Sequence, residues 1–167
     1  MSLPPSPSCV MSSKTPADSS SPSALARAFM SSVFSSVLEQ PVAELARHEK
    51  IEAYVLPGGC VMQLYREIAA KRPGLFTHVG LGTFVDPRQS GGKLNKRAQE
   101  DLVELVQIDG RELLRYKPFP VDVAIIRGSF ADPHGNISLD QEPANLEIYA
   151  VAAAAHNSGG KVIAQVR

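Results

Sequence analysis

The sequence predicts an α/β fold with a mainly parallel sheet, and three observations support this. Segments typical of strands and of helices alternate along residues 43–167, an order characteristic of α/β proteins. Two strand-like segments, at 121–126 and 161–166, are almost continuously aliphatic, as in strands buried on both faces. All 12 glycines lie beyond residue 42, whereas 13 of the 17 serines lie before residue 43. The globular part is therefore expected to begin near residue 43.

Residues 1–42 are expected to form a Ser/Pro-rich tail. Residues 1–23 hold too little apolar surface to offset the entropy of ordering them, so we expect disorder there. Residues 24–38 place apolar side chains near helical spacing among serines and with no acidic residue, as in a transit peptide. An unstructured tail and an artefact of the gene model are the alternative interpretations.

The globular part opens with elements expected from local patterns. Residues 43–50 indicate a short helix end, and the alternating residues Ile51–Leu56 predict a strand. From 61 to 69, apolar side chains recur at i, i+3, i+4 and i+7, which predicts a helix with one apolar stripe. Lys71 and Arg72 are expected in its last turn, before the helix-ending pair at 73–74.

The middle of the chain predicts a loop between β elements. Phe76–Gly80 indicates a second strand, and a long glycine-rich loop follows at 81–95. Residues 98–106 are expected to start helical and to become a strand. Asp109-Gly110 separates two strand-like runs, which is the pattern of a β-hairpin with a type I′ turn.

The last third predicts strand, helix and strand. After the buried strand at 121–126, residues 132–136 indicate a turn. Pro143 suits the first turn of a helix whose inner face carries small residues, and residues 157–160 suit a left-handed helix end. The strand at 161–166 has no helix after it to cover it. We therefore expect an incomplete sheet whose exposed apolar surface causes aggregation or dimerisation.

Composition excludes several functional classes. The 17 basic and 17 acidic residues balance, so no bulk positive field favours nucleic acid or anionic lipid. No apolar run reaches the length of a membrane helix. Two cysteines and four histidines without ligand spacing give no reason to expect a metal. Cys60 is expected to be a small buried hydrophobe and His78 a packed strand residue, rather than catalytic groups.

A family resemblance rests on the run HVGLGTFVDPRQSGGKLN at residues 78–95. Four further runs of the sequence match the same family, in the same order along the chain. The chain resembles the family I coenzyme A-transferases, especially the acetate/propionate enzymes and more distantly the 3-oxoacid enzymes. The four further runs are KIEAYVLPGG (50–59), EDLVELVQIDGRELLRYKPFPVDVAIIRGS (100–129), ADPHGNIS (131–138) and NSGGKVIAQV (157–166).

The resemblance implies a partial NagB/RpiA-like domain. Family members have two related α/β domains or subunits, and residues 43–167 would be an incomplete N-terminal, α-type domain. The family's nucleophile is a glutamate of the second half, which forms a glutamyl-CoA intermediate, so no catalytic residue is assigned to this chain. The implied partners are an acyl-CoA, a carboxylate acceptor and a second CoA-transferase domain or subunit. Full-length relatives are expected to be homo-oligomers, with no metal, redox cofactor, nucleic acid or membrane involved.

The loop after the second predicted strand is the candidate substrate site. In open α/β sheets ligands bind at the carboxyl ends of strands. Glycines there would let backbone amides approach an oxyanion, and the two basic side chains would face a carboxylate or a phosphate. The alternative is a long connection whose glycines only permit its turns. The candidate substrate-binding residues are Gly80, Gly82, Thr83, Arg88, Gly91, Gly92 and Lys93.

Two functions from different classes therefore stay open. One is a CoA-transferase that moves CoA between a short-chain acyl-CoA and a carboxylate, in which this chain alone is inactive. The other is a non-catalytic fragment or interaction module derived from such an enzyme. The sequence does not identify the donor and acceptor acids. Related short-acid and ketone-body metabolism makes a mitochondrial or a cytoplasmic location the expectation.

Overall fold

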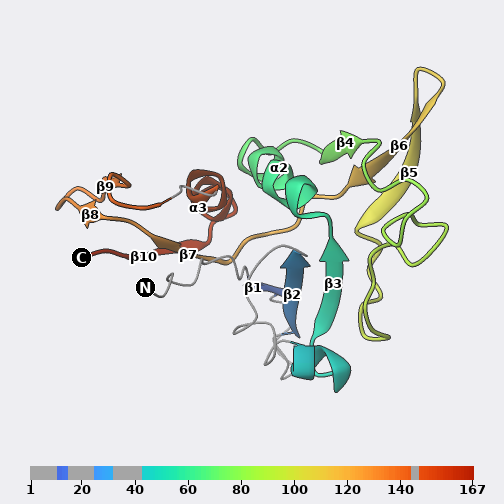
Figure 1. The fold of residues 1–167 in the computed structure, drawn as a ribbon, viewed down its shortest axis with the longest axis horizontal. Coiled ribbons are helices and arrows are strands. Elements are labelled where there is room, and N and C mark those ends of the chain that lie inside the picture. The colour runs from blue at the N-terminus through green and yellow to red at the C-terminus, as the bar shows by residue number, and fades with distance from the viewer. Residues whose placement is uncertain (1–10, 15–24, 32–42, 144–146) are drawn as a thin grey trace.

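The computed structural model describes residues 11–14, 25–31, 43–143 and 147–167 (Figure 1). It contains two helices, α2 (Gly58–Ala69) and α3 (Ile148–Asn157), and a helical turn over residues 43–47. The strands are β1 (Met11–Lys14), β2 (Leu25–Ser31), β3 (Glu52–Leu56), β4 (Leu75–Thr77), β5 (Val103–Ile108), β6 (Arg111–Tyr116), β7 (Val123–Arg127), β8 (Phe130–Ala131), β9 (Ile137–Ser138) and β10 (Lys161–Gln165).

The main sheet has the strand order β10-β7-β1-β2-β3. β10 pairs in parallel with β7, and β2 pairs in parallel with β3. β1 lies between these pairs and runs antiparallel to both of its neighbours. It pairs with β7 through one residue pair, Met11 with Val123. The predicted α/β class is confirmed, and the parallel sheet is confirmed in part because β1 interrupts it.

The first segment of the chain departs from its prediction. Strand β1 forms inside the stretch where disorder is expected, and strand β2 lies within residues 24–38, whose apolar side chains recur near helical spacing. Both strands therefore lie within the expected Ser/Pro-rich tail. The apolar spacing of 24–38 is local, whereas the β2 backbone pairs with β3, which begins more than 20 residues later. The rest of the expected tail lies outside the described residues.

Helix α2 follows β3 directly and confirms the apolar stripe. Its buried side chains include Val61, Leu64 and Ile68, at the spacing of one helix face. The helix ends at Ala69, so Arg66 rather than the expected Lys71 and Arg72 is the basic residue of the last turn.

A second, antiparallel sheet has the order β4-β6-β5. β5 and β6 form the expected hairpin, and Asp109 and Gly110 both have positive φ, at 49° and 74°. A type I′ turn requires positive φ at both central residues, which is why Asp-Gly predicts it correctly. β5 begins at Val103, so the helical start expected at 98–102 is wrong. β4 ends at Thr77, two residues into the strand expected at 76–80.

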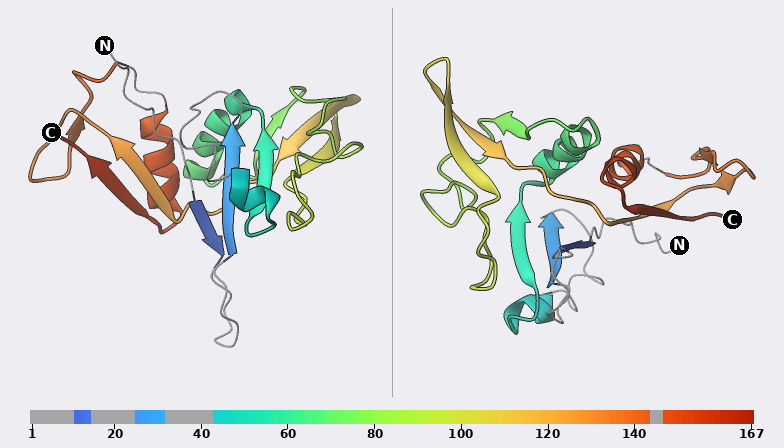
Figure 2. Two further views of the ribbon diagram at one scale, coloured as in Figure 1. Left: turned by 60° about the horizontal axis from the view of Figure 1, so that its bottom comes forward. Right: turned by 180° about the vertical axis from the view of Figure 1, so that it is seen from behind.

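Helix α3 covers one side of β7 and β10 (Figures 1 and 2). It begins at Ile148, after Glu147 with a φ of 63°, so Pro143 does not start it as expected. It ends as predicted, with Gly159 at a φ of 80°. The expected burial of β7 and β10 on both faces is wrong, since Ile125 and Ile163 are 55% and 54% exposed.

The hydrophobic core lies where these layers meet. α2 packs against α3, and the Asn157 side chain donates a hydrogen bond of 2.6 Å to the carbonyl oxygen of Ala69. The core therefore runs continuously from the second sheet through α2 to α3. Its largest fully buried side chains are Tyr54, Tyr116, Leu56, Leu64, Leu102, Leu114, Val85 and Val121.

Candidate functional site

The loop over residues 78–95 leaves β4 and returns along β3. Its last residues are fixed to that strand: the Val55 amide donates to the Gly92 carbonyl at 2.8 Å, and the Leu94 amide donates to Ala53 at 2.9 Å. Lys93 forms an isolated antiparallel bridge with Tyr54. The loop therefore extends the edge of β3, and its middle lies next to the end of β4.

Asp86 organises the middle of this loop. Its residue is fully buried, and one carboxylate oxygen, Oδ2, accepts from the Gly82 amide at 2.8 Å and from Arg88 Nη2 at 2.8 Å. The other oxygen, Oδ1, accepts from the Arg88 amide at 2.9 Å and from its Nε at 3.0 Å. A bidentate arginine–carboxylate pair is both strong and directional. Gly82 and Arg88, both proposed as substrate ligands, thus meet on a carboxylate of the same chain.

These bonds make the stability of the chain depend on pH. The Arg88 side chain and the Gly82 and Arg88 amides hold the pKa of the Asp86 carboxyl well below its usual value. In the unfolded chain this carboxyl titrates near its usual pKa of about 4. As the pH falls through that value, the unfolded state therefore takes up a proton before the folded state does, and stability is lost.

We predict that Asp86→Asn removes this part of the acid sensitivity. The free energy of unfolding of the unsubstituted chain should fall from pH 5 to pH 3 more steeply than that of the variant. The gap between the two should be widest at neutral pH and should narrow as the pH falls. Urea unfolding across this range measures both curves. Parallel curves for the two proteins would show that the Asp86–Arg88 pair makes no pH-dependent contribution to the free energy of unfolding.

The four candidate glycines serve different structural purposes. An added Cβ at Gly80 would lie 2.4 Å from Val85 Cγ2, and one at Gly92 would lie 2.8 Å from the Val55 carbonyl oxygen. Both positions therefore need glycine because side chains and backbone pack there. Gly82 has open space around it but a φ of 72°, and Gly91 is buried with a φ of 62°. All four have a positive φ, and at Gly82 and Gly91 this left-handed backbone is by itself the reason that glycine is favoured.

The remaining candidates are also held within the chain. Thr83 donates its hydroxyl to the Gly80 carbonyl at 2.7 Å, which closes a turn at the start of the loop. Lys93 donates to Asp101 Oδ1 at 2.6 Å and to the Gln99 carbonyl at 3.1 Å. Its ammonium group therefore lies against the segment before β5, apart from the Asp86 cluster. Of the two basic side chains, Arg88 is the more exposed, at 51% against 29%.

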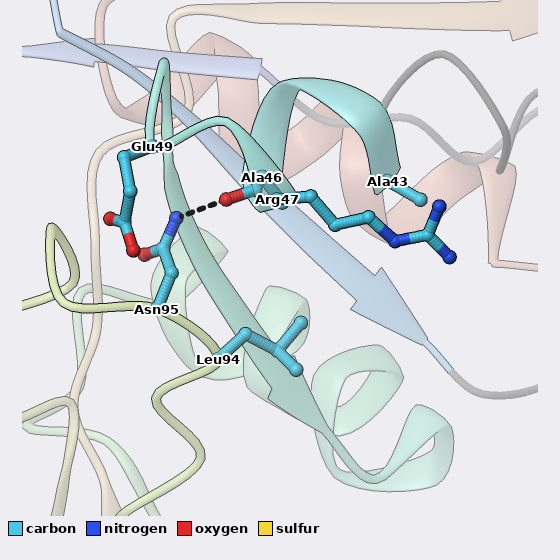
Figure 3. A pocket seen from close by; sticks show the side chains of 6 residues that line it. All are labelled: Ala43, Ala46, Arg47, Glu49, Leu94 and Asn95. Carbon is cyan, nitrogen blue, oxygen red and sulfur yellow. Dashed lines mark hydrogen bonds between the residues drawn. The ribbon is translucent and has the colours of Figure 1, made fainter.

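Two hollows adjoin the loop. The first, of ≈ 390 Å³, lies on its outer side and is lined by Gly82, Thr83, Phe84, Gln89 and Ser90. The second, of ≈ 320 Å³, lies at the loop's end and is lined by Ala43, Ala46, Arg47, Glu49, Leu94 and Asn95 (Figure 3). The first hollow contains two of the predicted substrate-binding residues, Gly82 and Thr83.

Asp86 and Asn95 are the organising residues that sequence reasoning missed. In Figure 3 the Asn95 amide points at the Ala46 carbonyl, to which it donates at 2.9 Å, and it also donates to Ile51 at 2.9 Å. Its side-chain oxygen accepts from the Ala98 amide at 3.1 Å. The Asp-Pro-Arg run contained a signal for the first of them, because Asp side chains accept from the amide two residues on.

Cys60 and His78, the other potential catalytic side chains, differ in burial. Cys60 is buried as expected, and burial raises the pKa of its thiol. His78 is exposed, so the expected packing of this residue is wrong, because β4 ends before it. Within residues 43–143 and 147–167, no three His, Cys, Asp or Glu side chains cluster as metal ligands would. No helix in the described part of the chain has the length and apolarity needed to cross a bilayer.

Comparison with known proteins decides the family. The model of the coenzyme A transferase family matches residues 3–165. The chain belongs to this family. A caffeate CoA-transferase of Acetobacterium woodii is 58% identical over 123 residues, which are 74% of this chain and 24% of that protein. The acetate CoA-transferase YdiF of Escherichia coli K12 is 44% identical over 126 residues, 75% of this chain and 24% of YdiF.

Solved structures of the coenzyme A transferase family agree with the fold. The YdiF apoenzyme of E. coli O157:H7 matches with a TM-score of 0.72 at 44% identity, over 75% of this chain and 24% of that one. A thioester complex of the same acyl-CoA transferase with CoA gives the same TM-score. Glutaconate CoA-transferase of Acidaminococcus fermentans, at 16% identity and a TM-score of 0.57, shares the fold alone. The chain thus spans about a quarter of the length of the curated relatives it matches.

Proposed function

We propose that this chain is the N-terminal part of a CoA-transferase that moves CoA between a short-chain acyl-CoA and a carboxylate acceptor. The observation that carries this proposal is the 58% identity to a caffeate CoA-transferase over 123 residues. The relatives' names set the reaction class, and the family resemblance of the 78–95 loop supports a shared mechanism. The likeness to acetate and caffeate enzymes favours a carboxylate acceptor and leaves its size open.

The proposed exchange proceeds through a glutamate supplied by the rest of the enzyme. Its carboxylate attacks the thioester carbonyl, the C–S bond breaks, and an acyl-glutamyl anhydride forms as CoA thiolate leaves. The thiolate then attacks the glutamyl carbonyl, which releases the first carboxylate and leaves a glutamyl-CoA thioester. The acceptor carboxylate attacks this thioester, which expels the CoA thiolate and forms a second acyl-glutamyl anhydride. The thiolate then attacks the acyl carbonyl of that anhydride, which gives the new acyl-CoA and releases the glutamate carboxylate. Such nucleophilic catalysis divides one difficult exchange into easier steps.

Within this scheme the 78–95 loop is proposed to line the acyl and CoA cleft. Gly82 and Thr83 border the outer hollow, and the half-exposed Phe84 offers an apolar side chain beside them. Arg88 contributes indirectly in this structure, because its guanidinium is bound to Asp86 and, at 3.3 Å, to Glu112. The loop is therefore proposed to form a rigid wall of the cleft, which contacts the substrate mainly through its shape rather than through its charges.

The proposed biological setting is short-chain acid or ketone-body metabolism, in the mitochondrion or the cytoplasm. The proposed working form joins this chain to a second CoA-transferase domain or subunit and then to further copies of the same assembly. Residues of the second half would supply the nucleophile and most of the pocket that selects the acid.

Activity measurements test the proposed function. The purified chain alone, given acetyl-CoA and propionate, should produce no propionyl-CoA. The same chain, co-expressed with the polypeptide that follows the matched segment of the A. woodii caffeate CoA-transferase, should exchange CoA with at least one short-chain or phenylpropenoic acid. Liquid chromatography of the acyl-CoA products measures both reactions.

Each outcome of these assays is informative. Exchange by the chain alone would show that the nucleophile lies within it and would overturn the proposed division of labour. A stable complex without exchange for any acid tried would favour the non-catalytic interaction module instead. A matched control replaces the catalytic glutamate in the added polypeptide by glutamine, which should abolish exchange and leave the complex intact.

A further inference from the structure

Strand β10 forms one edge of the main sheet. It pairs with β7 only, in parallel and in register from Lys161 to Gln165. The bonds to β7 come from alternate residues: the Lys161 amide donates to Asp122, and the Gln165 carbonyl accepts from Gly128. In a parallel ladder the residues between these point their amides and carbonyls the other way. Val162 and Ala164 therefore direct their backbone groups away from β7, along the open edge of the sheet.

The sheet face at this edge is also apolar and uncovered. On the face turned to α3, Ala124 and Ile126 of β7 are buried. On the opposite face Ile125 and Ile163 are direct cross-strand partners, and both side chains are more than half exposed. A pair of β-branched residues at this position normally packs against a further layer. The open edge and the open face meet at the same strand.

The sequence of β10 is that of an interior strand. Its residues KVIAQ carry apolar side chains on both faces, and Val162 and Ile163 are 40% and 54% exposed. Edge strands of stable sheets are normally protected by charge, proline, bulges or a covering segment. In β10 no proline and no covering segment occurs among the described residues, and its one charged residue, Lys161, lies at its start. Such a strand is suited to pair with a further strand.

We propose that the outer edge of β10, together with the Ile125–Ile163 face, is the docking surface for the remaining part of a CoA-transferase. That part adds a strand beside β10 and covers the two isoleucines with an apolar layer. The proposal rests on the proposed function, and it names the partner surface. Two observations select this occupant: the chain spans only 24% of relatives that it matches at up to 58% identity, and the surface lies beside β10, at one end of the five-stranded main sheet.

The experiment tests the edge and the face with separate variants. Ala164→Pro removes an outward amide and leaves the β7–β10 bonds intact, since those come from residues 161, 163 and 165. Ile163→Lys places a charge on the open face. Each variant of the full chain, tagged, is co-expressed with the polypeptide that follows the matched segment of the A. woodii caffeate CoA-transferase. The amount co-purified should fall at least about tenfold for each, the loss of roughly 1.4 kcal/mol or more of binding free energy.

Ile108→Lys is the matched control. Ile108 is 40% exposed at the end of the β5–β6 hairpin, so the same substitution adds the same charge away from the proposed surface. This variant should co-purify within about twofold of the unsubstituted chain. Circular dichroism of each variant without the partner should match that of the unsubstituted chain, which separates loss of docking from loss of folding.

The outcomes distinguish the surface from the function. An active complex that forms equally well with Ala164→Pro and Ile163→Lys would overturn the surface and leave the proposed function standing. A complex that forms, depends on both residues and has no transferase activity would support the surface and overturn the function. Self-association that both variants abolish, with no binding of the added polypeptide, would assign the edge to a second copy and overturn the proposal.

Discussion

Replacing Tyr116 by alanine should lower the free energy of unfolding by about 4 kcal/mol, in the range found for large-to-small changes of core aromatics. Tyr116 is fully buried and ends β6 in the centre of the antiparallel sheet, where it pairs with Leu75 on one side and Val103 on the other. Its hydroxyl donates at 2.8 Å to the Val79 carbonyl at the start of the 78–95 loop. The truncation would leave a cavity and would also release the loop.

Tyr116→Phe separates these two effects. It retains the ring and removes the hydroxyl, so it should cost only about 1 kcal/mol, the usual net value of one hydrogen bond. Urea unfolding followed by circular dichroism measures both variants. A phenylalanine variant as unstable as the alanine variant would show that the hydroxyl, through its bonds to Val79 and to the Cys60 side chain, matters more than the packing of the ring.

Gly80→Ala should be the most destabilising single change in the candidate loop, by about 3 kcal/mol, because overpacking and a left-handed backbone act together. A Cβ at this position would lie 2.4 Å from Val85 Cγ2 and 2.6 Å from the Tyr116 hydroxyl oxygen. The φ of Gly80 is 102°, outside the region that side chains with a Cβ normally adopt. Neither strain can relax without moving a core residue.

Gly82→Ala is the control for the backbone effect alone. Its φ of 72° is also positive, but nothing lies within 4 Å of an added Cβ. It should cost about 1 kcal/mol, the penalty of a left-handed conformation for a residue other than glycine. Chemical denaturation of both variants gives the difference. Equal losses would mean that the atoms around Gly80 move easily to admit a Cβ, and that the left-handed backbone alone accounts for the lost stability.

Local chemistry explains which elements could be predicted. Helix α2 is specified by its own apolar stripe, and the β5–β6 hairpin by the Asp109-Gly110 turn, so both were predicted close to their actual positions. Strand β2 could not be predicted this way. Its apolar spacing suits a helix, and the strand β3 with which it pairs begins more than 20 residues further along the chain.

The burial of a strand's side chains depends on the layers packed against it, and for this reason the predicted two-sided burial of β7 and β10 is wrong. The aliphatic runs of β7 and β10 correctly indicate strands, and their pattern assumes layers on both sides. Among the described residues only α3 covers these two strands, on one side, so Ile125 and Ile163 are exposed. The expectation of exposed apolar surface agrees with these two residues, and its consequence for association stays a prediction.

In the candidate loop, residue types indicated where glycine was needed but not why. Arg88 was expected to face a ligand, but its guanidinium pairs with the Asp86 carboxylate two residues earlier. The same holds for Lys93, whose partner Asp101 is eight residues further along. A basic side chain in a loop is thus a weak indicator of a ligand when an acidic residue is within reach.

The hydrogen bonds within the 78–95 loop have a consequence for the affinity of what binds there. A flexible loop must lose conformational entropy each time it binds, which weakens affinity by roughly 0.5–1.5 kcal/mol for each immobilised rotamer-rich side chain. Here Asp86, Arg88 and Asn95 order the loop when the chain folds. A ligand or partner that binds this loop therefore encounters a pre-formed surface. Its binding should be rigid docking, with little change in the hydrogen exchange of the loop amides.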